Sequence, residues 1–386
     1  MNSDRPVPST RRLLEVDFFR GAAILVIFWN HLLLLVQTAG FLVRSPFRIH
    51  YGFSDSAAVF VFLSGLVSGI VYDKVLESNG FLQAQLKALR RAGQIYGGQL
   101  ITLGVLVACA SLWSDRGSLD PLRRQLEDFR AHPIAEGLGL ISLQSCLDYV
   151  DILPFYIVIL TLVPIVLLGF RKHPALTLLV SSTIYLGVQV FRILKLNLWM
   201  FDWFVNPFAW QFLFVLGLYV GYRRRNGPFA LPRYRPLVAL AAVIAVVSFV
   251  KIPWMQSTLS PALASMGIVS LAALPIPWIQ KDFLEPVYLL HFISLAYLAW
   301  LAAPKIREIV YTSFARPLVI TGQHSLFLYC LATILDYVLT HFIVGIGGRP
   351  WVFLVAGLLG CSFIVGTAMA FWWRPAQQQV QLARQG

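Results

Sequence analysis

Long apolar runs recur along almost the whole chain, and they restrict its possible folds more than any other feature. A helix needs about 20 apolar residues to cross the roughly 30 Å hydrocarbon core of a bilayer. Hydrophobic residues make up 58% of the 386 residues and charged residues only 13%, which suits a bilayer better than water. The sequence therefore predicts an all-α fold, a polytopic transmembrane helix bundle of about ten helices. The expected spans are 17–38, 53–72, 93–113, 151–170, 174–195, 206–222, 237–252, 285–303, 317–343 and 350–373.

The distribution of charge predicts how the bundle is oriented. Most of the 31 Lys and Arg residues fall in the segments on one side of the predicted spans, so the positive-inside rule places both termini in the cytoplasm. The stretch 255–279 is apolar but interrupted by three prolines, and it could be a span, a re-entrant segment or an interfacial segment. The expected organisation is a cytoplasmic segment 1–16, a membrane domain 17–373 and a cytoplasmic tail 374–386.

Composition also argues against several functional classes. The net charge of +13 is spread over short clusters between apolar runs, so nucleic acid is not an expected partner and the lipid bilayer is. The four cysteines show no CxxC or Cys/His ligand spacing, so no metal site is expected. Nucleotide-binding loops and the common hydrolase motifs do not occur. Function must therefore lie in the bundle or at its mouths.

The first span carries the densest set of ionisable residues, Asp17, Arg20 and His31. Such groups are costly in hydrocarbon unless paired or hydrated, so each is a functional candidate. Arg20 and His31 are eleven positions apart, which places them on one helix face about 16 Å apart along the axis. A cation and a deeper imidazole on one face would suit a tunnel that holds an anionic donor. The donor would react at the inner end of the tunnel, near the imidazole. Alternatively, Arg20 could reach the headgroups and His31 could be a packing residue.

The second span begins with Ser54 and Asp55 and continues to Ser64. Asp55 could cap the helix, because a carboxylate is favourable at a helix N-terminus. It could equally reach across the short loop and orient the imidazole of His31, as a carboxylate often does for a general base.

Later spans add polar and aromatic side chains that a sugar-binding mouth would need. Caps, an aromatic belt at the membrane interface or hydrogen bonds between helices would explain the same residues. The candidates for substrate binding in these spans are Asp151, Tyr156, Asn206, Trp210, Gln211 and His291, and Asp17, Ser54 and Ser64 join them from the first two spans.

Six blocks in order resemble the OpgC family, inner-membrane succinyltransferases that modify osmoregulated periplasmic glucans. They are LLEVDFFRGAAILVIFWNH, GFSDSAAVFVFLSG, DILPFYIVIL, NPFAWQFLFVLG, LLHFISLAYL and GQHSLFLYC. The family is related to the acyltransferase-3 membrane O-acyltransferases, whose hallmark is an Arg, ten residues and a His, and Arg20 to His31 has this spacing.

The resemblance implies an enzyme of the bacterial inner membrane that moves an acyl group to glucan hydroxyls in the periplasm. The donor would be cytoplasmic acyl-CoA, in this family succinyl-CoA, as a co-substrate with no permanently bound cofactor. His31 matches the catalytic histidine and Arg20 its paired arginine, and we expect Asp55 to support them. The residues alone distinguish neither succinyl from acetyl nor direct transfer from an acyl-histidine intermediate.

Two other classes of function are alternatives to the acyltransferase. A secondary transporter or flippase for a glycan or an organic anion should show two related halves with charges near the midplane of both. Here the intramembrane charges concentrate in the first span, which favours an enzyme. A structural partner of a glucan-synthesis complex would tolerate Ala at His31, whereas an acyltransferase would not.

Overall fold

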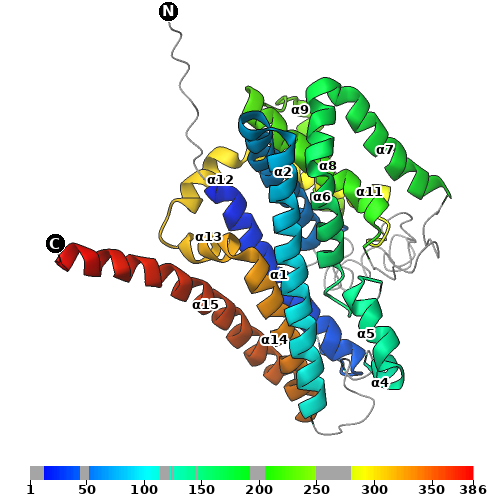
Figure 1. The fold of residues 1–386 in the computed structure, drawn as a ribbon, viewed down its shortest axis with the longest axis vertical. Helices are drawn as coiled ribbons and strands as arrows, with labels where there is room; N and C mark the ends of the chain where they lie inside the picture. Colours follow the sequence, from blue (N-terminus) through cyan, green and yellow to red (C-terminus); the bar gives the residue numbers. More distant parts are fainter. Residues whose placement is uncertain are drawn as a thin grey trace, which may run out of the picture.

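The computed structural model describes residues 13–43, 52–113, 122, 126–144, 147–191, 205–248 and 280–385, and within these ranges every regular element is an α-helix (Figure 1). The predicted segment 255–279 lies outside the described residues. The helices are α1 (Leu14–Thr38), α2 (Ser56–Leu112), α4 (Glu127–Ala131), α5 (Pro133–Ile141), α6 (Ile152–Lys172), α7 (Pro174–Phe191), α8 (Pro207–Asn226), α9 (Arg235–Ser248), α11 (Pro286–Leu301), α12 (Ala303–Val310), α13 (Arg316–Gln323), α14 (Ser325–Gly345) and α15 (Pro350–Gln385).

The described helices confirm a polytopic helical membrane protein, with fewer candidate spans than the ten expected. Six helices are long and apolar enough to cross a membrane, or seven if the bent pair α11 and α12 is one span. Three differences account for most of the gap. The first is a matter of counting, because the expected spans 53–72 and 93–113 lie on the two arms of α2, which count as one helix. The others are that α8 includes Gln211 and has three arginines in its last turn, and that α9 has only 14 residues.

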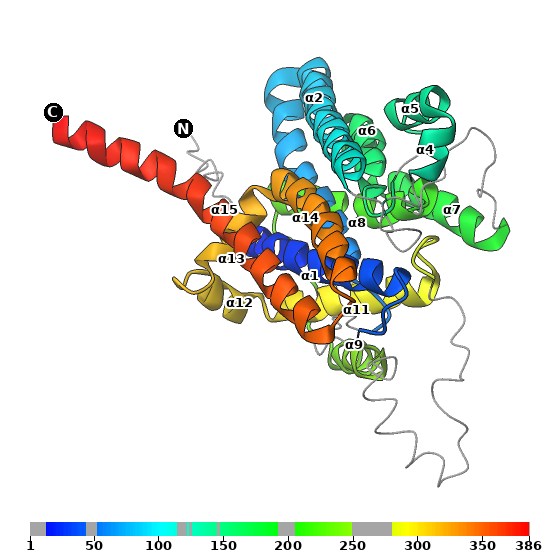
Figure 2. The same ribbon diagram turned by 90° about the horizontal axis from the view of Figure 1, so that it is seen from below.

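Helix α2 reverses direction at Gly80. A straight helix would separate Tyr72 from Lys87 by about 22 Å, yet the Lys87 Nζ lies 6.0 Å from the centre of the Tyr72 ring. Gly80 has φ +78°, a conformation that favours glycine. The two arms of α2 therefore lie against each other (Figure 2), and the residues after the turn come back to the bundle.

Glycines bring α2 and α8 into backbone contact. A Cβ at Gly65 would collide with the carbonyl oxygen of Phe214, and one at Gly217 would collide with that of Phe62. Small residues allow this close approach in membrane proteins, where apolar side chains gain little by associating. The first arm of α2 is thereby fixed against α8.

Helix α1 crosses the middle of the bundle and packs on α2, α13 and α14 (Figures 1 and 2). Its contact with α13 depends on two glycines, because a Cβ at Gly21 would collide with the Leu318 carbonyl and one at Gly322 with the Asp17 carbonyl. The predicted span 317–343 is divided at His324, where α13 ends and α14 begins. This packing fixes the face of α1 that carries Arg20 and His31.

An ionic cluster joins α2, α6 and α8 at one end of the bundle. The carboxylate of Asp73 is fully buried and accepts hydrogen bonds from Arg171 Nε at 2.8 Å, from Asn226 Nδ2 at 2.8 Å and from Arg225. A buried carboxylate needs such partners to offset its desolvation. The cluster thus holds the C-terminal ends of α6 and α8 beside the first arm of α2.

Candidate functional site

Two cavities lie along α1, one lined by Arg20 and the other by His31. The first has a volume of about 420 Å³, and the second about 390 Å³. We call them the basic cavity and the acidic cavity after the charged residues that line them. The basic cavity is lined by Arg20, Lys87, Arg90 and Arg91, and the acidic cavity by Asp55, Asp148, Asp151 and Lys281, together with Asn30 and His31.

The basic cavity is formed between α1, both arms of α2, α6 and α14. Its described lining contains four cationic side chains and no carboxylate, and Ser64 and Tyr156 contribute hydroxyl groups. The Arg20 guanidinium lies over the Phe60 ring, 5.2 Å from its centre, a cation–π arrangement that orients the group. Three predicted site residues, Arg20, Ser64 and Tyr156, therefore meet in one cavity.

The acidic cavity contains the imidazole of His31. The His31 side chain is 15% exposed, whereas its Nδ1 atom is buried, so the exposed part of the ring faces the cavity that it lines. The ring packs against Tyr149, with centroids 4.3 Å apart. His31 Nδ1 lies 3.7 Å from Oδ2 of Asp336, a residue of α14.

Asp55 lines the acidic cavity with His31 and also caps α2. Its Oδ1 accepts hydrogen bonds from the Ala57 backbone N–H at 2.9 Å and from the Tyr288 hydroxyl at 2.7 Å, and its Oδ2 lies 2.7 Å from Lys281 Nζ. Both readings of Asp55 are thus compatible with its position, and its support of His31 stays a prediction. The Asp336 carboxylate, on α14, lies within ion-pair distance of the ring.

Asp336 was missed in the sequence, although a signal was present. It is the one acidic residue of the predicted span 317–343, whose other residues are mostly apolar. Such a residue is a functional candidate for the same reason as Arg20 and His31. Sequence alone could not show that its helix packs beside the histidine.

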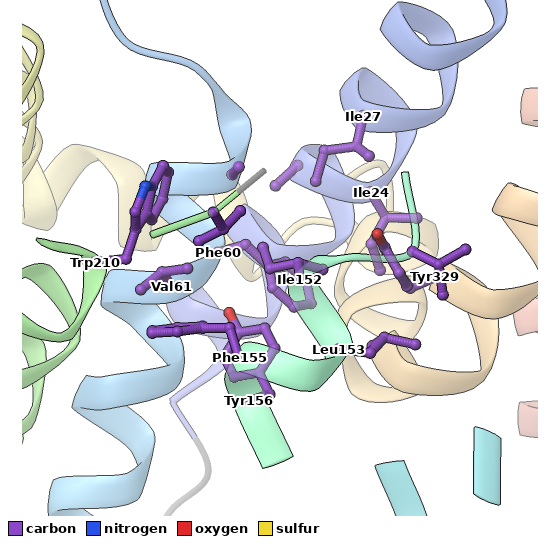
Figure 3. Close-up of a cluster of buried hydrophobic side chains, with 14 of the residues drawn as sticks. Ile24, Ile27, Phe60, Val61, Ile152, Leu153, Phe155, Tyr156, Trp210 and Tyr329 are labelled. Atoms are coloured by element: carbon purple, nitrogen blue, oxygen red, sulfur yellow. The ribbon is translucent and has the colours of Figure 1, made fainter. Parts of the chain in front are cut away.

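Two residues, Ile152 and Tyr329, line both cavities. In Figure 3, Ile152 lies between Phe60 of α2 and Tyr329 of α14. The Tyr329 hydroxyl donates a hydrogen bond to the Tyr149 carbonyl at 2.6 Å, which ties α14 to the loop that precedes α6. The cavities are therefore separated by little more than one layer of side chains.

Several predicted binding residues line neither cavity within the described part of the chain. Asn206 caps α8, Trp210 donates a hydrogen bond to the Lys281 carbonyl at 3.0 Å, and Gln211 bonds with Ser181 at 2.7 Å. A direct role in binding stays a prediction for each of them. The other members of this group are Asp17, which is buried in α1, and Ser54 and His291, whose Oγ and Nδ1 atoms are 2.7 Å apart.

The loop before α6 supplies two titratable groups to the acidic cavity, Tyr149 and Asp151. Burial raises the pKa of Asp151 to about 6, a shift that Asp148 adds to and Lys281 opposes. Burial likewise raises the pKa of the Tyr149 phenol above its usual range, so this phenol stays protonated at neutral pH. The Asp151 carboxylate thus loses its charge near pH 6 instead of near pH 4.

A family model described as OpgC protein matches residues 12–376. The chain belongs to the OpgC family. No curated protein and no solved structure matches it. The part that matches the OpgC model includes Arg20, His31 and Asp336 and every described residue that lines the two cavities.

Proposed function

We propose that the protein is an O-acyltransferase of the bacterial inner membrane that moves a succinyl group from cytoplasmic acyl-CoA to hydroxyls of periplasmic glucans. The observation that carries this proposal is the pair of cavities. They have opposite charge, lie along the helix of Arg20 and His31, and share a wall at Ile152 and Tyr329. Membership of the OpgC family supports the choice of donor and acceptor.

The basic cavity suits the donor. Acyl-CoA carries several phosphate groups, and arginine and lysine are the residues that bind phosphate most often. Lys87, Arg90 and Arg91 lie at the start of the second arm of α2, and Arg20 lies deeper, on α1. The outer cations would hold the nucleotide, and Arg20 would pair with an anionic part of the donor near the shared wall.

The acidic cavity suits a sugar acceptor. Carboxylates accept hydrogen bonds from sugar hydroxyls, and amides both accept and donate them. Asp55, Asp148 and Asp151 supply the carboxylates here, and Asn30 supplies an amide. His31 lines the same cavity. Because its Nδ1 is buried, the nitrogen available to a substrate hydroxyl is Nε2.

The proposed reaction is direct transfer with His31 as general base. Nε2 takes the proton of the glucan hydroxyl while the hydroxyl oxygen attacks the thioester carbonyl. The new C–O bond forms, the C–S bond breaks, and the imidazolium returns its proton to the departing thiolate. A stable acyl-histidine adduct, formed with radioactive donor in the absence of acceptor, would contradict the direct route.

A transporter or flippase for a glycan or an organic anion is the second candidate, because two cavities on opposite sides of a thin wall would also suit a carrier. The carrier would move its substrate unchanged, whereas the acyltransferase adds a defined mass to the glucan. The same experiment therefore separates the two.

The test is mass spectrometry of periplasmic glucans from a strain that lacks the protein, complemented with the native chain or with His31→Ala at equal membrane abundance. The native chain should add the mass of a succinyl group, and His31→Ala should lower transfer by about 10²–10⁴-fold, the usual contribution of a general base. His173→Ala is the matched control, because His173 is exposed at the end of α6 and lines neither cavity.

Each outcome of this experiment is informative. If the native chain adds no mass, the glucan assignment is wrong and the carrier gains support. If His31→Ala adds as much mass as the native chain, His31 is a packing residue and the proposed mechanism is wrong.

A further inference from the structure

Helix α14 carries a carboxyl group inside the bundle that the reaction above does not use. Asp336 is 1% exposed, and neither of its carboxyl oxygens has a hydrogen-bond partner in the described part of the chain. Burying a carboxylate without partners destabilises the fold. An ionisable residue kept at such a position within a membrane-spanning helix points to a function.

The group that Asp336 faces is the histidine of the proposed reaction. Its Oδ2 lies 3.7 Å from His31 Nδ1, and Nδ1 is likewise buried without a hydrogen-bond partner among the described residues. This distance is longer than a hydrogen bond, but catalytic hydrogen bonds are often long in the absence of substrate and shorten when it binds. Two unsatisfied buried groups thus lie next to each other on α1 and α14.

Other charged groups near the ring have different roles. Asp55 and Lys281 line the same cavity and are 2.7 Å apart, and Asp55 also accepts hydrogen bonds from Ala57 and Tyr288. Tyr149 packs against the ring at a tilt of 40° from the loop before α6, and Asp148 and Asp151 line the cavity from this loop. Asp336 differs from these carboxylates because it is in neither cavity lining and reaches the buried edge of the ring.

We propose that Asp336 is a positioning residue that accepts a hydrogen bond from Nδ1–H of His31 and so directs the Nε2 lone pair toward the acidic cavity. This inference rests on the proposed role of His31 as general base. When Nε2 takes the glucan proton, the imidazolium bears a positive charge that the Asp336 carboxylate offsets. When the thiolate leaves, the proton departs from Nε2, and Asp336 keeps the proton of Nδ1 in place throughout. A carboxylate that fixes the tautomer of a catalytic histidine works in this way.

The kinetic test compares Asp336→Asn with Asp336→Glu in the full-length protein. Asn has nearly the same shape, but its amide N–H can donate to Nδ1, which would put the ring proton on Nε2 and block the base. We expect kcat to fall by about 100-fold or more in Asp336→Asn while both KM values change less than about threefold, and Asp336→Glu to restore part of kcat. The His31→Ala/Asp336→Asn double variant should be no slower than His31→Ala alone.

A chemical test works without any transfer activity. Diethyl pyrocarbonate modifies the unprotonated nitrogen of an accessible histidine, which for His31 is Nε2. At fixed pH, modification of His31, read by peptide mass spectrometry, should be several-fold slower in Asp336→Asn than in the native chain. Exposed His173 serves as the internal reference within each sample, and equal thermal stability shows that the fold is intact.

The two tests separate this inference from the proposed function. Slower modification of His31 in a protein that transfers nothing would support the positioning role and contradict the acyltransferase. Active transfer with unchanged kcat and unchanged modification in Asp336→Asn would overturn the positioning role alone.

Discussion

The basic and acidic cavities are nearly equal in volume, about 420 and 390 Å³, and both lie along α1. They differ in the origin of their charge. The outer cations of the basic cavity, Lys87, Arg90 and Arg91, come from one helical arm after the turn at Gly80. The carboxylates of the acidic cavity come from helix beginnings and a loop, so two unrelated local structures produce the contrast.

Helix polarity accounts for the sign of the acidic cavity alone. Asp55 begins α2, Asp151 begins α6 and Asn206 begins α8, and all three lie at or next to the acidic cavity, whose lining includes Val205. Carboxylates are favoured at helix N-termini, and cations are favoured at C-termini. The helix beginnings therefore account for the carboxylates, whereas the cations of the basic cavity lie near the beginnings of α1 and of the second arm of α2, so helix polarity does not explain them.

The largest expected effect comes from filling the wall between the cavities. Ile152 is 7% exposed and lines both cavities, so Ile152→Trp should separate donor from acceptor. We expect transfer to fall by about 100-fold or more, because small displacements of reacting groups have effects of this size. Donor binding, measured by equilibrium dialysis of the purified protein, should change less than about fivefold.

The control for this substitution is Ile152→Leu, which keeps the volume of the wall and should retain most activity. Membrane abundance must be compared, because overpacking costs about 1–3 kcal/mol. An Ile152→Trp variant that is fully active would show that the substrates meet elsewhere and that the shared wall has no functional meaning.

A smaller effect is expected from changing the charge of one cavity at a time. Lys87→Gln should raise the donor KM about 3–10-fold without changing the acceptor KM, because a charged hydrogen bond to phosphate is lost. Asp148→Asn should raise the acceptor KM instead. The donor effect should shrink at high salt, since Lys87 is exposed and its charge is screened.

Lys172→Gln is the matched control for Lys87→Gln. Lys172 is an exposed cation at the end of α6 and does not line the basic cavity. Equal effects of the two lysine substitutions, or a change in both KM values for Lys87→Gln, would mean that the basic cavity does not bind the donor.

The class of fold and the placement of Arg20 and His31 on one helix were predicted correctly, because both depend on local sequence. Long apolar runs and the eleven-residue spacing of Arg20 and His31 depend on one helix at a time. The reversal between the expected spans 53–72 and 93–113 was predicted, but its position at Gly80 and the helical continuation of both arms up to that glycine were not, because glycine is also tolerated within helices. Asp336 was missed as the neighbour of His31 for a related reason, since that contact joins residues 305 positions apart.

The smallest expected effect concerns Asp151, which precedes the span of α6 and whose pKa is raised from 3.8 to about 6 by burial. Between pH 4 and pH 6 the folded state binds more protons than the unfolded state, so this group lowers stability as pH rises through that window. At neutral pH, ionised Asp151 therefore lowers the stability of the folded protein. Asp151→Asn should raise Tm by about 2–4 °C at pH 7.5 and by much less at pH 4.5.

The same substitution should weaken the acceptor, because it removes one of the carboxylates that distinguish the two cavities. A stabilised protein with a several-fold higher acceptor KM and an unchanged donor KM would show that Asp151 is retained for binding. Tm is measured by tryptophan fluorescence of the purified protein in detergent at both pH values. Equal Tm changes at pH 4.5 and pH 7.5 would mean that ionisation of Asp151 does not affect the stability of the fold. An unchanged acceptor KM would mean that Asp151 does not bind the acceptor.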